Sequence, residues 1–391
     1  MDRATRTIVN QNFGRVEDID VSSLFRGDYE AKSADSSLDS PGSNVGYNVL
    51  YQQSPVHEPV VDERYLANGG RKPTWPDDAD FAVCLTHDVD QVTNYSVRQN
   101  IRETARLVGL RETTVGKAKV LLKQATRFPK ILYHARQEQD PYHAFERWLD
   151  VEKRIGAKST FFFMPEVVNE PHRTDPNYTF SDTIVFDGEE RTVAEMMREI
   201  DSQGWEVGLH PTWHTYDDPH ELARQKAQVE GVLGHEVRSV RQHFLHYDIE
   251  RTPRAHTEAG FRFDSTLGFT DGVGFRFGTS YPWQLYDGEN NERLPILELP
   301  LVIQDGALLN SRKGLSLDKD TAFAYLRQLV DRVENVGGVL TLNWHPRFVG
   351  EDPWWSLYER VLRHLETKDA WVASVDEIGN WWLRNGFNRI Q

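Results

Sequence analysis

The sequence predicts an α/β barrel, and three observations support this fold class. Short apolar runs of strand type alternate with amphipathic helical segments over about 300 residues of the chain. Several of the runs are apolar on both faces, as a parallel sheet covered by helices requires. Several of the helical segments end at glycine, where the C-cap of a helix lies. A regular β-then-α order of this kind is typical of a barrel whose parallel strands are surrounded by helices.

Eight runs have the composition of buried strands, and amphipathic segments such as YHAFERWLDVEKRIG and DTAFAYLRQLVDRVENVGG lie between them. The runs are 81–86 (FAVCLT), 159–164 (STFFFM), 205–210 (WEVGLH), 237–242 (VRSVRQ), 261–266 (FRFDST), 296–303 (ILELPLVI), 337–344 (GGVLTLNW) and 370–375 (AWVASV). Cys84, the single cysteine, lies in the first run and is expected in the core. One cysteine excludes an internal disulfide and a cysteine-rich zinc site.

Two segments lie outside this alternation. Residues 1–75 form a poorly patterned lead-in, rich in Ser, Asp, Gly and Asn from 31 to 54, and we expect an irregular N-terminal segment before a barrel at 76–391. Residues 91–140 follow the first strand with a helical pattern rich in Lys and Arg. We interpret them as a helical insertion at the end of the strand, where barrel enzymes place substrate-shaping loops. A cap that only covers apolar surface is an equal alternative.

The composition excludes several classes of partner. The chain has 391 residues, with 45 Lys and Arg against 60 Asp and Glu, so its formal charge is −15. An acidic chain is a poor match for bulk nucleic acid or an anionic membrane, both of which need basic surface. No stretch reaches the roughly 18 apolar residues of a membrane span. The first residues lack the apolar region of a secretory signal, so we expect a cytoplasmic location. The sequence does not predict the oligomeric state.

Polar groups that suit catalysis recur where the predicted strands end. In a parallel barrel the carboxyl ends of all strands meet at one rim, so groups far apart in sequence become neighbours. Each group alone has a structural interpretation as a turn former, a surface ion pair or a core histidine. Two histidines and one carboxylate make a catalytic metal set, and a further carboxylate and histidine supply the acid–base pair of hydrolysis. The groups are Asp88, Asp90, His210, His214, Arg241, Asp264 and His345.

The sequence resembles the polysaccharide deacetylases with a NodB-homology domain, carbohydrate esterase family four, over roughly residues 81 to 382. The resemblance is carried by THDVD (86–90) for the TFDD motif, HPTWH (210–214) for HxxxH, RQHF (241–244) at the arginine motif, FDST (263–266) for YDSS and LTLNWHP (340–346) for the late Leu-x-His strand. It implies a distorted (β/α)7 barrel that removes acyl groups from N-acylated sugars with a divalent metal. Zinc is the first expectation, with cobalt, nickel and manganese as alternatives.

The resemblance also implies roles for individual residues. Asp88 matches the catalytic base and Arg241 the residue that holds it, while His345 matches the general acid. The metal triad falls on Asp90, His210 and His214, and two histidines four residues apart share one face if the segment is helical.

Two departures from the family pattern keep parts of this assignment open. Val89 separates the two aspartates that are adjacent in the family, so the roles of Asp88 and Asp90 are open to exchange. RQHF replaces Arg-x-Pro-Tyr, which leaves the backbone oxyanion donor near Gln242 to Phe244 unassigned.

We therefore expect an enzyme that removes an N-acyl group, first of all N-acetyl, from an amino sugar in a glycan or glycan precursor, with no nucleic acid as partner. Flat rings suit the apolar faces of sugars, so the substrate-binding candidates are Trp213, Phe244, Trp283 and Trp344. One alternative is a deformylase or another amidohydrolase with the same site acting on a small or nucleotide-linked substrate. Another is a glycan-binding barrel without catalysis.

Overall fold

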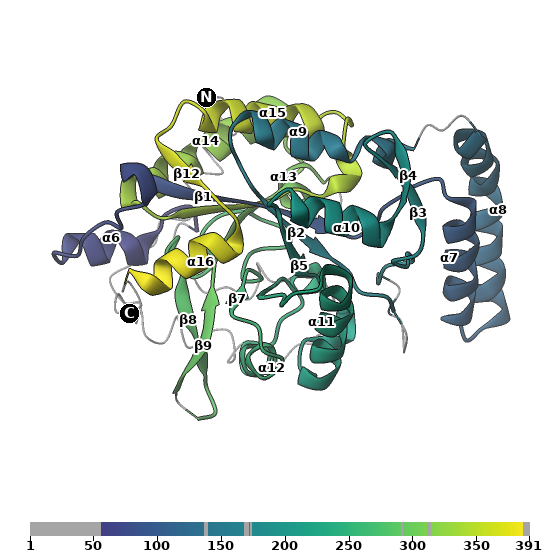
Figure 1. The fold of residues 1–391 in the computed structure, drawn as a ribbon, viewed down its shortest axis with the longest axis horizontal. Coiled ribbons are helices and arrows are strands. Elements are labelled where there is room, and N and C mark those ends of the chain that lie inside the picture. The colour runs from purple at the N-terminus through teal and green to yellow at the C-terminus, as the bar shows by residue number, and fades with distance from the viewer. Residues whose placement is uncertain are drawn as a thin grey trace.

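A curled, largely parallel sheet forms the centre of the computed structural model, which describes residues 56–385 apart from 137–139, 168–171, 173, 291 and 311–313. The sheet runs, in spatial order, β10 (Leu301–Gln304), β11 (Val339–Asn343), β1 (Phe81–Val89), β2 (Thr160–Phe163), β5 (Glu206–Leu209), β6 (Ser239–Val240), β7 (Phe263–Asp264), β9 (Glu292–Glu298) and β8 (Trp283–Asp287). β9 and β10 are consecutive in the chain, yet β9 pairs with β7 and β10 pairs with β11. The chain therefore joins the two ends of the sheet, which confirms the predicted (β/α) barrel (Figure 1).

All eight predicted runs contain strands, and β12 (Ala370–Val372) adds to β1. The run 296–303 is interrupted at Leu299 and Pro300, because proline offers no N–H to a sheet. The hairpin of β3 (Thr183–Phe186) and β4 (Glu189–Thr192) was not predicted. Its signal is the Asp187-Gly188 turn, where both residues have positive φ, 53° and 72°, as a two-residue hairpin loop requires.

Helices cover the outer face of the sheet (Figure 1). They are α9 (Glu146–Arg154), α10 (Val193–Ser202), α11 (Pro219–Leu233), α12 (Thr252–Glu258), α13 (Asp305–Leu309), α14 (Lys319–Val336) and α15 (Trp354–Leu365). Helix α16 (Val375–Arg384) instead packs Ile378 and Trp382 against the inner face, in one cluster with Phe263. Helix α10 begins with a capping box, in which Thr192 and Glu195 each bind the other's backbone N–H. Helices α11 and α14 end at the left-handed Gly234 and Gly337, as the glycine pattern predicts.

β1 explains how the sheet positions polar groups. All nine of its residues are buried, and successive side chains point to opposite faces. Ala82 and Cys84 pack against Phe162 and Phe263 from β2 and β7, so they lie inside the barrel, and the buried Cys84 is a core residue as expected. Asp88 lies four residues after Cys84 and shares this inner face. The intervening His87 points outward and binds Glu152 of α9 at 2.7 Å.

A short helix lies within the segment expected to be irregular. Val60–Ala67 form α6, whereas residues 1–55 of that segment lie outside the described residues. Asp62 of α6 is fully buried and accepts hydrogen bonds from the Thr279 hydroxyl and from the Ser280 amide and hydroxyl, at 2.7 and 2.8 Å for Ser280. One carboxylate thus ties α6 to the loop before β8.

Replacing Asp62 with alanine is expected to destabilise the fold by about 3 kcal/mol, because three buried donors lose a shared acceptor. Chemical denaturation measures the change. The matched control is Glu63→Ala one residue along the same helix, where the side chain is exposed and the change is expected within about 0.5 kcal/mol. Equal effects of the two substitutions would contradict the anchoring role.

The insertion predicted at 91–140 forms the helical hairpin α7 (Val97–Gly109) and α8 (Thr114–Arg136). Figure 1 shows it beside β3 and β4 at one end of the molecule, with α8 outermost. Arg102 of α7 binds Asp182 with two hydrogen bonds of 2.8 and 2.9 Å, which fasten the hairpin to the barrel. Among the helices that the structure describes, none combines the length and hydrophobicity needed to cross a bilayer.

Candidate functional site

The carboxyl ends of four strands bring the predicted polar groups to one mouth of the barrel. A cavity of about 120 Å³ opens there. Asp88 is near the end of β1, and Asp90 follows the strand directly. His210 follows β5, Arg241 and His243 follow β6, and His345 follows β11. The residues that line this cavity include Asp88, Asp90, His210, His243, Phe244 and His345.

Both carboxylate oxygens of Asp88 accept hydrogen bonds, and these favour its ionised form. Oδ1 lies 3.1 Å from an Arg241 guanidinium nitrogen, and Oδ2 accepts a 2.7 Å hydrogen bond from the Asn343 amide. Arg241 is itself fully buried, with further hydrogen bonds to Thr86 and Ser265. Burial alone raises the pKa of Asp88, but Arg241 and the nearby His210 and His345 outweigh it and hold the pKa below its ordinary value.

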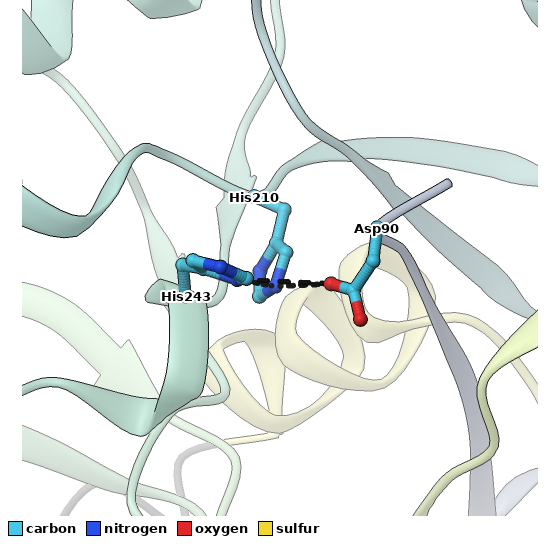
Figure 2. Close-up of side chains that lie close together, drawn as sticks. All are labelled: Asp90, His210 and His243. Carbon is cyan, nitrogen blue, oxygen red and sulfur yellow. Dashed lines mark hydrogen bonds and ion pairs between the residues drawn. The ribbon is translucent and has the colours of Figure 1, made fainter. Parts of the chain in front are cut away.

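Asp90, His210 and His243 form a compact group of possible metal ligands (Figure 2). One ligand atom from each lies within 4.8 Å of the others. The Asp90 Oδ1 atom is 3.5 Å from His210 Nε2 and 3.6 Å from His243 Nδ1, while the two ring nitrogens are 3.1 Å apart. Two imidazole nitrogens and one carboxylate oxygen are a donor set of the kind that binds a catalytic zinc ion and leaves a position open.

The outer hydrogen bonds of the two histidines fix their tautomers. The Nδ1 of His210 lies 2.6 Å from the Arg241 carbonyl oxygen, and the Nε2 of His243 lies 3.0 Å from the Thr174 carbonyl oxygen. A carbonyl only accepts, so these nitrogens carry protons and the facing nitrogens are the ones that can bind a cation. Burial lowers the pKa of His243 to about 3, so the ring is neutral near pH 7. With their outer nitrogens bound to carbonyls, both rings aim their second nitrogen at one point beside Asp90, and the residues therefore fit a divalent metal.

His214 does not join this group, which corrects the predicted triad. Residues 213–215 form a single 3-10 turn after an extended Thr212, so His210 and His214 do not share the face of an α-helix. The His214 side chain is exposed, and its ring lies edge-on to His172 with the centroids 5.5 Å apart. His243 occupies the third position instead. The signal for it was a histidine at a strand end, within the motif that departs from the family pattern.

His345 is positioned by Asp305, which the sequence reasoning did not single out. The Nδ1 atom of His345 lies 2.7 Å from Asp305 Oδ1, and its backbone N–H donates to Oδ2 at 2.9 Å. Burial lowers the pKa of His345, but Asp305 and, to a smaller extent, Asp90 together outweigh burial, and the pKa is raised above its ordinary value. Nε2 faces the cavity, 3.7 Å from Asp90 Oδ2. The arrangement presents a proton on Nε2 to the cavity.

The loop after β6 adopts an unusual backbone. Phe244 and Leu245 have φ of 58° and 53°, values that residues other than glycine rarely adopt and that cluster at functional sites. The Gln242 N–H donates to the hydroxyl of Thr266, which follows β7, at 3.1 Å, so it is already engaged and is not the oxyanion donor. Asp264 accepts a hydrogen bond from the Thr266 N–H and binds His256 at 2.7 Å. This strand-end aspartate therefore positions Thr266, the partner of Gln242, and does not line the cavity.

The four aromatic candidates divide into two pairs. Phe244 is 39% exposed and lines the cavity, and Trp213 packs edge-on against it with the ring centroids 5.8 Å apart. Trp283 and Trp344 are buried in the core, where Trp283 packs against Phe277 and Trp344 is fully buried. The expectation that Trp283 and Trp344 contact substrate is therefore corrected, because strand-end tryptophans here fill the space between sheet and helices.

The helical insertion forms part of a second cavity beside the first. This cleft, of about 280 Å³, shares Asp90, His243, Phe244 and Arg347 with the cavity of the site. Its opposite wall belongs to the hairpin and includes Gln99, Asn100, Glu103, Arg106 and Arg127. The insertion thus contributes polar side chains next to the candidate catalytic groups.

Comparison with known proteins shows likeness at the level of structure. No family model and no curated protein sequence matches the chain. A putative polysaccharide deacetylase from Mycobacterium smegmatis superposes with a TM-score of 0.52 at 20% identity, over 81% of this chain and 94% of that one. Puue allantoinase gives the same TM-score at 14% identity and the same coverage of both chains. The chain has the barrel fold that these two proteins share.

Proposed function

We propose that this protein is a metal-dependent hydrolase that removes an N-acyl group from an amino sugar. One observation carries the proposal. The same mouth of the barrel holds a group of possible metal ligands, a carboxylate with a lowered pKa and a histidine with a raised pKa. The possible metal ligands are Asp90, His210 and His243, and one ligand atom from each lies within 4.8 Å of the others. The pKa of the nearby Asp88 is lowered, which favours its ionised form, and the pKa of His345 is raised, which favours its protonated form.

The metal would be held by Asp90 Oδ1, His210 Nε2 and His243 Nδ1, with zinc as the first expectation. When bound, such a metal polarises an amide carbonyl and makes water a stronger nucleophile at neutral pH. The carbonyls of Arg241 and Thr174 accept the outer N–H of the two histidines and keep the ligand nitrogens aimed inward.

The acid–base pair divides the proton transfers of amide hydrolysis. Asp88 accepts the proton of the attacking water, and Arg241 and Asn343 keep this carboxylate oriented toward the cavity. His345 gives its Nε2 proton to the nitrogen of the scissile amide, so that the sugar leaves as a neutral amine. Asp305 stabilises the protonated ring and fixes its direction. Phe244 offers a rim surface for the apolar face of a sugar ring.

A substrate panel tests the proposal. The purified chain, supplied in turn with zinc, cobalt, nickel and manganese, is incubated with N-acetylated and N-formylated amino sugars, and free amine is quantified. We expect amine release that depends on metal, and the acyl group released most rapidly identifies the substrate class. Metal binding without amine release from any N-acyl sugar would overturn the proposal.

A second candidate function is the hydrolysis of a small cyclic amide. The site cavity is only about 120 Å³, which suits a single small ring, and the fold is equally similar to that of an allantoinase. Ring opening produces a carboxylate without freeing a sugar amine. Cyclic amides in the same panel, with acid production followed by titration, therefore separate the two functions.

The proposed role of Asp305 predicts a shifted pH profile. Because Asp305 raises the pKa of His345, the protonated acid persists to higher pH than in an ordinary histidine and is lost as pH rises through that pKa. Asp305→Asn lowers the pKa, so the alkaline limb of kcat/KM should move to lower pH and the rate at neutral pH should fall about 10- to 100-fold. Asp320→Asn, at an exposed position, is the matched control. A lower rate with an unmoved alkaline limb would indicate a purely structural role.

A further inference from the structure

The α7–α8 hairpin carries most of the exposed large hydrophobic side chains in the described part of the chain. The described residues include seven such side chains, and six of them lie between residues 101 and 133. Four belong to α8, and Leu122 at 69% and Val115 at 66% are the most exposed. The six are Ile101, Leu110, Val115, Leu121, Leu122 and Tyr133. Apolar groups gathered on one projecting element indicate an interaction surface.

The same hairpin is basic, whereas the rest of the molecule is acidic. Residues 97–136 hold ten Lys or Arg and two Asp or Glu, whereas the rest of the chain holds 35 and 58. Arg102 and Arg106 bind groups of the barrel, but the lysines at 117, 119, 123 and 130 are all exposed. The overall charge of −15 therefore conceals a basic projection on an acidic body, and it is this local charge that a partner meets.

The apolar and basic groups of α8 follow separate strips. Val115, Leu122 and Tyr133 are spaced by seven and eleven residues, close to two and three turns of about 3.6 residues, so they align on one side. Lys119 and Lys123 follow an adjacent strip along the helix. Gln124 and Ile131 are buried on the inner side. We call the exposed apolar strip and its flanking lysines the outer face of α8.

We propose that the outer face of α8 binds the surface of an anionic lipid bilayer. Helices that lie in a membrane interface combine an apolar strip with flanking Lys and Arg, whose long chains reach the headgroups. Each basic group near an anionic surface adds to the attraction, while the acidic barrel is repelled. The protein would then be held by its hairpin with the barrel facing away from the lipid.

The size of the outer face favours a bilayer over a second copy of the chain. Helix α8 has 23 residues, so it is about 35 Å long and about 10 Å wide. One side of it offers roughly 350 Å², less than half of the roughly 800 Å² per partner of a stable protein interface. A bilayer needs no matched surface. Lysine is also depleted in protein–protein interfaces, whereas it is common beside membrane-bound apolar strips.

The position of the hairpin relates this surface to the site. The hairpin forms one wall of the cleft that adjoins the candidate catalytic groups, through residues that include Asn100 and Arg127. Helix α8 itself lies at the edge of the molecule (Figure 1). Lipid contact at α8 would bring the cleft near the headgroups.

Co-sedimentation of the full chain with vesicles tests the proposal independently of catalysis. We expect binding to vesicles of phosphatidylcholine mixed with phosphatidylglycerol and none to phosphatidylcholine alone. The double substitutions Val115→Gln with Leu122→Gln, and Lys119→Glu with Lys123→Glu, should each reduce partitioning at least about tenfold. All four side chains are exposed, so unchanged thermal unfolding will show that both variants fold.

A matched charge reversal elsewhere is the control. Arg71→Glu with Lys72→Glu changes the net charge equally in the exposed segment between α6 and β1 and should leave vesicle binding intact. Absence of binding to anionic vesicles by the unsubstituted chain would overturn the proposal. So would a dimer in analytical ultracentrifugation that the Val115→Gln and Leu122→Gln substitutions dissociate, or binding to RNA that survives those substitutions while vesicle binding is absent.

Discussion

Replacement of His243 with alanine should weaken the binding of zinc or cobalt at least about a hundredfold, whereas His214→Ala should leave it unchanged. His243 Nδ1 is 3.1 Å from His210 Nε2 and 3.6 Å from Asp90 Oδ1, and the protonated Nε2 is held by a carbonyl. The His214 ring is exposed and contacts His172. Titration of metal-stripped protein, followed by calorimetry, measures both affinities.

The two histidines make the comparison well controlled. Both are on loops of the same barrel mouth, and each is replaced by the same residue. His243 is fully buried, so its alanine variant also leaves a cavity, and its unfolding should be recorded alongside the titration. His243→Gln fills that volume without supplying an imidazole ligand and should also lose the metal. Retained affinity in His243→Ala together with lost affinity in His214→Ala would restore the triad that HxxxH predicts.

The sequence predicts the strands and the barrel mouth because both depend on local patterns. Alternation in β1 places Cys84 and Asp88 on one inner face, and strand ends in a parallel barrel converge whatever the loops do. Burial of both faces by helices makes the strand runs continuous and easy to recognise. For these reasons the predicted runs contain the observed strands, and Asp88, Asp90, His210 and His345 share one cavity.

The failures concern side chains whose direction depends on loop backbone. His214 follows an extended residue and a 3-10 turn, and neither is visible in residue spacing. His243 turns inward just before Phe244, where φ is positive without a glycine to signal it. Trp344 precedes a site histidine, but adjacent residues of an extended segment point to opposite sides, so Trp344 enters the core. Proximity in sequence is therefore a poor guide to what faces the cavity.

Asp88→Asn should reduce kcat/KM about a thousandfold while metal affinity changes little, and Asp90→Asn should lose both. Asp88 has its two oxygens on Arg241 and Asn343, whereas Asp90 approaches the ring nitrogens of His210 and His243. Because Arg241 holds the pKa of Asp88 below its ordinary value, the carboxylate is ionised throughout the neutral range and is able to accept a proton. An amide at the same position cannot.

Asparagine preserves the shape of Asp88, but it leaves the fully buried Arg241 without its carboxylate partner. The remaining bonds of the guanidinium to Thr86 and Ser265 limit this cost, and we expect a loss of about 3 kcal/mol in the free energy of unfolding. Activity and metal titration should therefore be measured on protein shown to be folded at the assay temperature. The aspartate whose replacement removes the metal is the ligand, and the one whose replacement removes only turnover is the base. If Asp88→Asn lost the metal while Asp90→Asn kept it, the two roles would be exchanged and Arg241 would orient a metal ligand.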